Sequence, residues 1–177
     1  MAAKLLLVES PDRHAEEVPV VREAVRAVVL DRDNRVLLFK AFPDKTRSRH
    51  FWITPGGGIA AGESATAALA RELAEECGLV GCEIGPLIWV REHVFALPTS
   101  GELIRQRERF YLVRVERHDV DVSGWDDFER IFMGEHRWWT IDAVVASADE
   151  FAPHRLAHLV TELVKGDIPN EPVDTGL

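Results

Sequence analysis

Residues 54–79 read TPGGGIAAGESATAALARELAEECGL, and this stretch joins a glycine-rich turn to a short helix. Pro55 has no amide donor, and three consecutive glycines permit positive φ angles and a close approach of the backbone. Ser64 can cap a helix over residues 65–77, most of which are strong helix formers. Gly78 is the expected end of that helix. The stretch therefore predicts a turn followed directly by a helix.

Three carboxylates lie close together on this predicted helix. At about 100° per residue, Glu72, Glu75 and Glu76 fall within an arc of roughly 100°, beside an apolar arc that would face the core. Like charges at this spacing repel one another, and a hard divalent cation such as Mg²⁺ turns that repulsion into binding. Arg71 is placed to hold Glu72 in a fixed orientation. The alternative is a solvated helix face rich in glutamate and arginine.

The spacing of the whole stretch distinguishes these alternatives. Gly57-x5-Glu63-x7-Arg71-Glu72-Leu73-x-Glu75-Glu76-x-Gly78-Leu79 resembles the Nudix box, with every specified position filled, and Trp52-x-x-Pro55-Gly56-Gly57 resembles its usual lead-in. The resemblance extends more weakly over about residues 22–148. Ala60 departs from it, because many members carry a glutamate at that position. The box indicates a chemistry and leaves the substrate open.

The resemblance implies hydrolysis of a diphosphate linkage in a nucleoside diphosphate joined to another moiety. It implies that Glu72 and Glu76 are metal ligands, that Glu75 binds the metal directly or through water, and that the Gly56 carbonyl is a backbone ligand. The implied catalytic set is Arg71, Glu72, Glu75 and Glu76, with Glu63 as a structural partner of Arg71. The general base stays open between Glu72 and a residue of a later loop. The implied cofactor is Mg²⁺, with Mn²⁺ as a substitute.

Residues outside the box are candidates for substrate binding. Lys45, Arg47 and Arg49 lie in a polar loop before the box, and a solvated loop is the alternative. Arg107 shares one strand face with its two alternating neighbours, facing either a phosphate or water. Glu135, with Glu129 as the alternative, is a candidate for a further carboxylate from a loop. Trp125 is a candidate for stacking on a base.

Composition limits the classes of function. The chain has 177 residues, 46% of them hydrophobic, and a formal net charge of −9. That charge argues against a nucleic-acid partner and favours a small nucleotide-type substrate. Cys77 falls on the apolar helix arc and is expected as a buried free thiol. The apolar run at residues 5–8 is too short for a signal sequence, and no stretch approaches a membrane span, so a cytoplasmic location is expected. A homodimer is left open.

The order of the patterns predicts an α/β sandwich in one domain over residues 1–177, and the resemblance implies a Nudix-type α/β/α sandwich with a mixed sheet. Two hairpins are expected, at residues 24–30 with 35–39 and at 87–95 with 103–115. A further strand at 137–141, a short helix at 142–147, an amphipathic helix at 153–165 and a loose tail at 170–177 follow them. The alternative function is a catalytically silent Nudix-like nucleotide-binding or regulatory domain. Such domains usually lose carboxylates of the box, and this chain keeps them.

Overall fold

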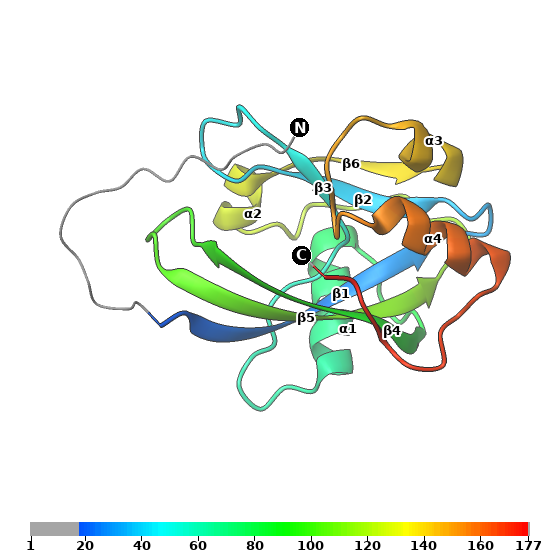
Figure 1. The fold of residues 1–177 in the computed structure, drawn as a ribbon, viewed down its shortest axis with the longest axis horizontal. Coiled ribbons are helices and arrows are strands. Elements are labelled where there is room, and N and C mark those ends of the chain that lie inside the picture. The colour runs from blue at the N-terminus through cyan, green and yellow to red at the C-terminus, as the bar shows by residue number, and fades with distance from the viewer. Residues whose placement is uncertain (1–17, 177) are drawn as a thin grey trace.

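The computed structural model describes residues 18–176, and its elements alternate between strands and short helices (Figure 1). In chain order they are β1 (Val20–Leu30), β2 (Val36–Ala41), β3 (Phe51–Ile53), α1 (Ala65–Cys77), β4 (Ile84–Ala96), β5 (Leu103–Arg114), α2 (Asp127–Phe132), β6 (Met133–Trp139), α3 (Ile141–Ala146), β7 (Phe151–Ala152), α4 (Leu156–Lys165) and β8 (Val173–Asp174).

The strands form a mixed sheet in the order β7-β3-β2-β1-β5-β4-β8, with β6 also paired to β2. The long central strands β1 and β5 are parallel, whereas β4 and β5 form an antiparallel hairpin. The pairing of β1 with β2 joins Leu30 to Val36 beside their connecting turn. Nearer the start of β1, the same edge forms backbone hydrogen bonds with the glycine-rich turn instead of with a strand. The sheet therefore opens at the point where the box begins.

Helices cover both faces of the sheet, as Figure 1 shows for α1 behind it and α4 in front of it. One apolar core joins the sheet to α3 and α4 through residues such as Val28, Trp89 and Leu159. The other joins the opposite face to α1 through residues such as Val29, Leu69 and Leu73. The alternation of side chains along β1 supplies both cores from one strand. The predicted α/β/α sandwich with a mixed sheet is confirmed.

The predicted helix of the box is confirmed in its bounds and its caps. The Ser64 side chain accepts a hydrogen bond from the amide of Ala67, and Gly78 adopts a left-handed φ of 68° that ends the helix. Cys77 and Cys82 are both free thiols, and Cys77 is buried as expected. Of Trp138 and Trp139 on β6, Trp139 lies in the core.

Several segments differ from the sequence prediction. The strand expected at 137–141 is β6 (Met133–Trp139), and β7 (Phe151–Ala152) was not expected. The expected loop after Trp125 contains α2, which begins at a capping box formed by Asp126 and Glu129. The expected loose tail contains β8, which pairs with β4 in parallel, and Thr175 donates its amide to the carbonyl of Val90. Neither short element has the hydrophobic periodicity by which a longer element is recognised.

The apolar run at residues 5–8 lies outside the described residues, and one domain over the whole chain stays a prediction. Within residues 18–176, no helix combines the length and the apolar character needed to cross a bilayer.

Candidate functional site

The glycine-rich turn lies directly against β1. The amides of Val25 and Ala27 donate to the carbonyls of Gly57 and Pro55, each at 2.9 Å. Gly56 has a φ of 132°, and a Cβ atom there would lie 2.2 Å from the Val25 carbonyl oxygen. Only glycine therefore fits at position 56, and this steric limit explains the glycine in the lead-in to the box.

Two carboxylates of α1 reach this turn from the face of the sheet that α1 covers. The Glu76 Oε2 atom accepts a hydrogen bond from the Gly56 amide at 2.6 Å. A Cβ atom on Gly57 would lie 2.6 Å from the carboxylate of Glu72, so glycine is also needed to admit that side chain. Both glutamates are buried although they are charged residues. The turn and the helix thus enclose two acidic groups together.

A third carboxylate comes from α2. Glu72, Glu76 and Glu129 each offer a carboxylate oxygen, and these oxygens lie within 4.8 Å of one another. Trp125 anchors this segment, because its indole Nε1 donates to the Glu76 carbonyl at 3.1 Å and its ring packs on Phe39 with centroids 5.9 Å apart. In this structure Trp125 therefore braces α1 and α2.

The electrostatics of the cluster favour a bound cation. Burial raises the pKa of Glu76 to about 8, with the charges of Glu72 and Glu129 adding to the effect and Arg26 and the Gly56 amide opposing it. Burial and neighbouring carboxylates also raise the pKa of Glu129. Three converging carboxylates in a buried site are unfavourable when ionised without a counter-charge. An oxygen-only set of this kind fits a hard divalent cation such as Mg²⁺, Mn²⁺ or Ca²⁺.

Arg71 ties the box together by contacting four of its parts. Its guanidinium donates to both carboxylate oxygens of Glu63 at 3.0 and 3.1 Å, and to Glu72 Oε1 at 2.7 Å. It also reaches Glu75 and the carbonyl of Gly58, each at 3.1 Å. The hydrogen bonds that Arg71 donates to Glu63 and then to Glu72 raise the pKa of Arg71 above its already high value. This planar fork fixes the orientation of Glu72.

The other predicted acidic residues lie differently. The side chain of Glu75 is half exposed and pairs with Arg71, outside the group of three carboxylates. Glu135 on β6 is also largely exposed and forms an ion pair with Lys40. Of the two alternatives for a carboxylate from the later segment, the structure brings Glu129 to the cluster.

The predicted basic residues before the box are engaged elsewhere. Arg47 donates to the carbonyls of Arg130, Ile131 and Met133, at the end of α2, and its guanidinium lies over the Phe42 ring at 4.6 Å. Arg49 pairs with Glu150 at 3.3 Å, with both side chains exposed. Arg47 therefore positions α2 in this structure, and a substrate role for either arginine stays a prediction.

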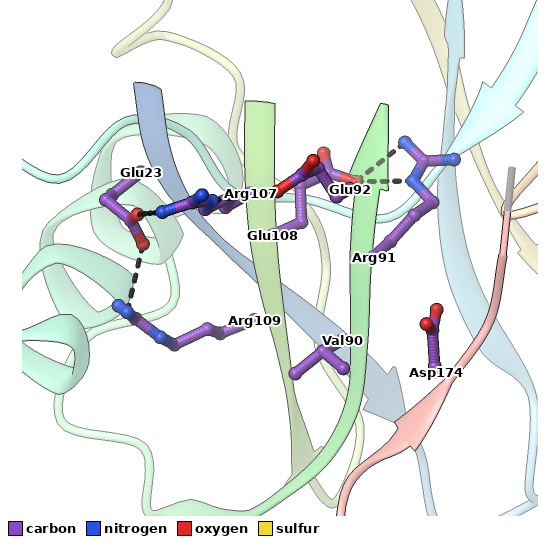
Figure 2. A pocket seen from close by; sticks show the side chains of 8 residues that line it. All are labelled: Glu23, Val90, Arg91, Glu92, Arg107, Glu108, Arg109 and Asp174. Carbon is purple, nitrogen blue, oxygen red and sulfur yellow. Dashed lines mark hydrogen bonds and ion pairs between the residues drawn. The ribbon is translucent and has the colours of Figure 1, made fainter. Parts of the chain in front are cut away.

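Arg107 is paired with glutamates of the two neighbouring strands. It contacts Glu92 on β4 at 2.8 Å and Glu23 on β1 at 3.8 Å, and Arg109 also pairs with Glu23. Figure 2 shows Arg107 and Arg109 pointing toward Glu23 in the pocket that they line. The odd-numbered residues of β5 lie on the α1 face, so Arg107 belongs to a surface network of ion pairs there.

Two residues that the sequence did not single out lie on the opposite face, where Arg26 contacts the turn and Glu108 contacts Arg26. Arg26 of β1 donates to the Gly56 carbonyl at 2.7 Å and to the Thr54 carbonyl at 3.2 Å. Glu108 of β5 accepts from Arg26 and is fully buried. The sequence held one signal for them. Arg26 and Glu108 are charged residues at even positions of β1 and β5, where the neighbouring even positions carry core residues.

The model of the NUDIX domain matches residues 20–162. This chain belongs to the Nudix family. The match covers the box, strands β1 to β7 and most of α4, so the resemblance seen in the box extends to the fold around it.

Relatives and solved structures agree with this assignment. The chain is 28% identical over 155 residues to an RNA pyrophosphohydrolase of Wolbachia pipientis wMel, covering 82% of this chain and 86% of the relative. It is 31% identical over 110 residues to an RNA pyrophosphohydrolase of Cronobacter sakazakii, covering 58% of this chain and 59% of that protein.

Two solved structures share the fold at 17% identity. They are the E. coli dihydroneopterin triphosphate pyrophosphohydrolase, with a TM-score of 0.61 over 83% of this chain and 99% of that one, and a MutT protein of Methanosarcina mazei Go1, with a TM-score of 0.59 over 85% and 98%.

Proposed function

We propose that this protein is a divalent-metal-dependent hydrolase that cleaves a diphosphate linkage in a nucleoside diphosphate joined to another moiety. The observation that carries the proposal is the convergence of Glu72, Glu76 and Glu129, with their oxygens within 4.8 Å, beside a glycine turn. Hydrolysis of a diphosphate needs charge neutralisation and positioning more than covalent chemistry by the protein. The two buried carboxylates of Glu72 and Glu76, with the half-buried Glu129, supply the ligands for that purpose.

The residues of the site divide the work among them. Glu72, Glu76 and Glu129 would hold the ion, and the Gly56 carbonyl is a proposed backbone ligand. We propose Mg²⁺ as the ion, with Mn²⁺ as a substitute, because the donors are oxygens without histidine or cysteine. When bound, the ion neutralises phosphate oxygens and lowers the pKa of a bound water. Arg71 keeps Glu72 oriented, and the exposed Glu75 can act through water.

Two candidates for the general base are present. The sequence left the base open between Glu72 and a residue of a later loop. Glu72 is held by Arg71, and Glu129 is the carboxylate from the later segment. A general base must lie within hydrogen-bond reach of the attacking water. Separate replacement of each by glutamine, followed over a range of pH, distinguishes the base from a ligand, because loss of the base removes the acidic limb of the kcat profile.

The names of the relatives bear on the substrate. The expectation of no nucleic acid rests on the net charge of −9, yet relatives at 28–31% identity are named RNA pyrophosphohydrolases. In RNA, a diphosphate linkage occurs at a phosphorylated end and not between nucleotides. A 5′-triphosphorylated oligonucleotide therefore belongs beside small nucleotides as a proposed substrate, and net charge does not exclude it.

A metal-supplemented substrate panel tests the proposal. The purified protein is incubated with Mg²⁺ and with nucleoside triphosphates, ADP-ribose, nucleotide sugars, dinucleoside polyphosphates or 5′-triphosphorylated RNA, and the products are separated by chromatography. We expect cleavage of a diphosphate linkage that stops in EDTA and in Glu76→Gln. Glu102→Gln, the same change at an exposed position in the β4–β5 turn, is the matched control. Binding of a nucleotide without turnover would instead support the silent binding domain.

A further inference from the structure

A cluster of buried charges lies on the face of the sheet opposite α1. Glu108 of β5 is fully buried, and its Oε1 atom accepts from Arg26 Nε at 3.0 Å and from Gln106 Nε2 at 2.8 Å. Its Oε2 atom accepts from Arg91 Nε at 2.7 Å. Figure 2 shows Arg91 directed to Glu108, away from Arg107 and Arg109. The cluster joins three neighbouring strands, β1, β5 and β4.

The carboxylate of this cluster stays ionised. Burial alone would raise the pKa of Glu108, but the guanidinium groups of Arg26 and Arg91 outweigh burial and hold it at about 2. Buried ion pairs contribute little net stability compared with apolar residues of similar volume, because desolvation offsets their attraction. A gain in stability therefore does not by itself account for a buried glutamate at position 108. The guanidinium of Arg26, which Glu108 binds, also donates to the glycine turn.

Arg26 completes the hydrogen bonds of the glycine turn. The backbone amides of β1 bind the carbonyls of Pro55 and Gly57. The carbonyls of Thr54 and Gly56 alternate with these, and both accept from Arg26 Nη1, at 3.2 and 2.7 Å. Four consecutive carbonyls are thus held by one strand, two through its backbone and two through a single side chain.

The contact with Gly56 connects this side chain to the acidic cluster. The Gly56 amide donates to Glu76 Oε2 at 2.6 Å, while the Gly56 carbonyl accepts from Arg26. A carbonyl oxygen has two lone pairs, so this one can bind Arg26 and still face a cation. Any rotation of the turn about Gly56 would move both the partner of Glu76 and the proposed backbone ligand.

We propose that Arg26, fixed by Glu108, is a positioning residue of the metal centre: it holds the Thr54 and Gly56 carbonyls so that the turn presents Gly56 to Glu76 and to the ion. This inference rests on the proposed function, because it assumes that the carboxylates bind a metal. It assigns to a strand residue outside the box the task of orienting the turn that the box supplies.

Arginine is required for this task by geometry. Its planar group donates from Nε to Glu108 and from Nη1 to the turn in one fixed arrangement. Lysine keeps the charge but has a single ammonium, which cannot keep both the carboxylate and the two carbonyls in that arrangement. Arg26→Lys therefore removes the positioning while preserving the charge balance of the cluster.

The experiment measures Mn²⁺ binding without substrate, from the electron paramagnetic resonance signal of free Mn²⁺, with thermal unfolding in EDTA recorded in parallel. We expect Arg26→Lys to bind Mn²⁺ about 10–100-fold more weakly than the wild type, as is usual when a residue that orients a ligand is lost. At saturating metal, kcat should fall while KM stays near its wild-type value. Glu108→Gln, which frees Arg26 from its anchor, should weaken binding in the same direction.

Arg91→Lys is the matched control. It makes the same substitution against the same carboxylate, and within residues 18–176 Arg91 makes no hydrogen bond to the turn. We expect its Mn²⁺ affinity to equal that of the wild type, even if its unfolding temperature falls as much as that of Arg26→Lys. Such a pair separates positioning from general stability.

The outcomes that overturn the inference are distinct from those that overturn the proposed function. If the wild type binds Mn²⁺ and folded Arg26→Lys binds it equally well, Arg26 does not position the site, and the proposed function stands. Equal losses of affinity in Arg26→Lys and Arg91→Lys would also overturn it, by showing a structural cluster only. If Arg26→Lys does not fold, wild-type affinity in Glu108→Gln overturns it. A wild type that binds no Mn²⁺ removes the metal centre and this inference with it.

Discussion

Replacing Glu76 with glutamine should make the metal-free protein more stable while it impairs the site. Glu76 is 4% exposed and lies within reach of the carboxylates of Glu72 and Glu129. Glutamine keeps the shape and an oxygen for the Gly56 amide, but it removes the ionisable group. The prediction follows from the raised pKa of Glu76. At neutral pH this carboxyl stays protonated in the folded protein but ionises when the chain unfolds, and this difference lowers the free energy of unfolding of the wild type.

The magnitude follows from the two pKa values. The pKa of Glu76 rises from an ordinary 4.5 to about 8 in the folded protein, chiefly through burial. The folded state therefore holds the proton more tightly, so the contribution to stability is full below pH 4.5 and is lost as the pH rises through 8. At pH 7 the loss spans about 2.5 pH units, or roughly 3 kcal/mol. The extra N–H of glutamine costs about 1 kcal/mol, leaving about 2 kcal/mol.

Thermal unfolding by circular dichroism measures this difference. In EDTA at pH 7, we expect Glu76→Gln to unfold about 4–8 °C above the wild type for a chain of this length. At pH 5 the difference should nearly vanish, because the wild-type carboxyl then costs less than about 1 kcal/mol. Millimolar Mg²⁺ should reverse the order by stabilising the wild type through binding. An unchanged or lower Tm for the variant in EDTA at pH 7 would refute the reasoning.

Three further predictions concern the same site. EDTA should abolish turnover, Mg²⁺ or Mn²⁺ should restore it, and Zn²⁺ should restore it less well because the ligands are carboxylates; full activity without metal would contradict the proposal. Glu129→Gln should lower kcat more than Glu135→Gln, whose carboxylate pairs with Lys40, and steady-state assays that show the reverse order would return Glu135 to the site. Arg71→Lys should weaken Mg²⁺ binding about 10–100-fold in titrations of kcat against Mg²⁺, whereas superimposable curves would mean that Arg71 is only a surface partner of Glu75.

The box could be interpreted from the sequence because its structure is local. The helix over 65–77, its Ser64 cap and its Gly78 end depend on residues within a few positions of one another, and the structure reproduces all three. The same holds for the contact of Arg71 with Glu63 and Glu72, which lie within eight residues of it. Glu63 lies just before the helix and Glu72 adjoins Arg71 on it, so these residues meet within one short segment.

The elements that the sequence missed depend on distant partners. β8 has two residues, and it forms because β4 offers a free edge more than 80 positions earlier. α2 has six residues and is held by Trp125 on Glu76 and by Arg47 on its last carbonyls. No local pattern of hydrophobic residues predicts elements that are stabilised in this way.

The sequence by itself determined the family resemblance, the glycine-rich turn and the helix that carries the acidic residues, because these depend on spacing and backbone freedom within one segment. The tertiary structure decided which charges meet. It brought Glu129 rather than Glu135 to Glu72 and Glu76, directed Arg47 to α2 and Arg107 to surface glutamates, and set Arg26, paired with Glu108, against the turn. The reason is that a carboxylate or a guanidinium acts over a few ångströms, and only folding sets the distance between residues of different strands and helices.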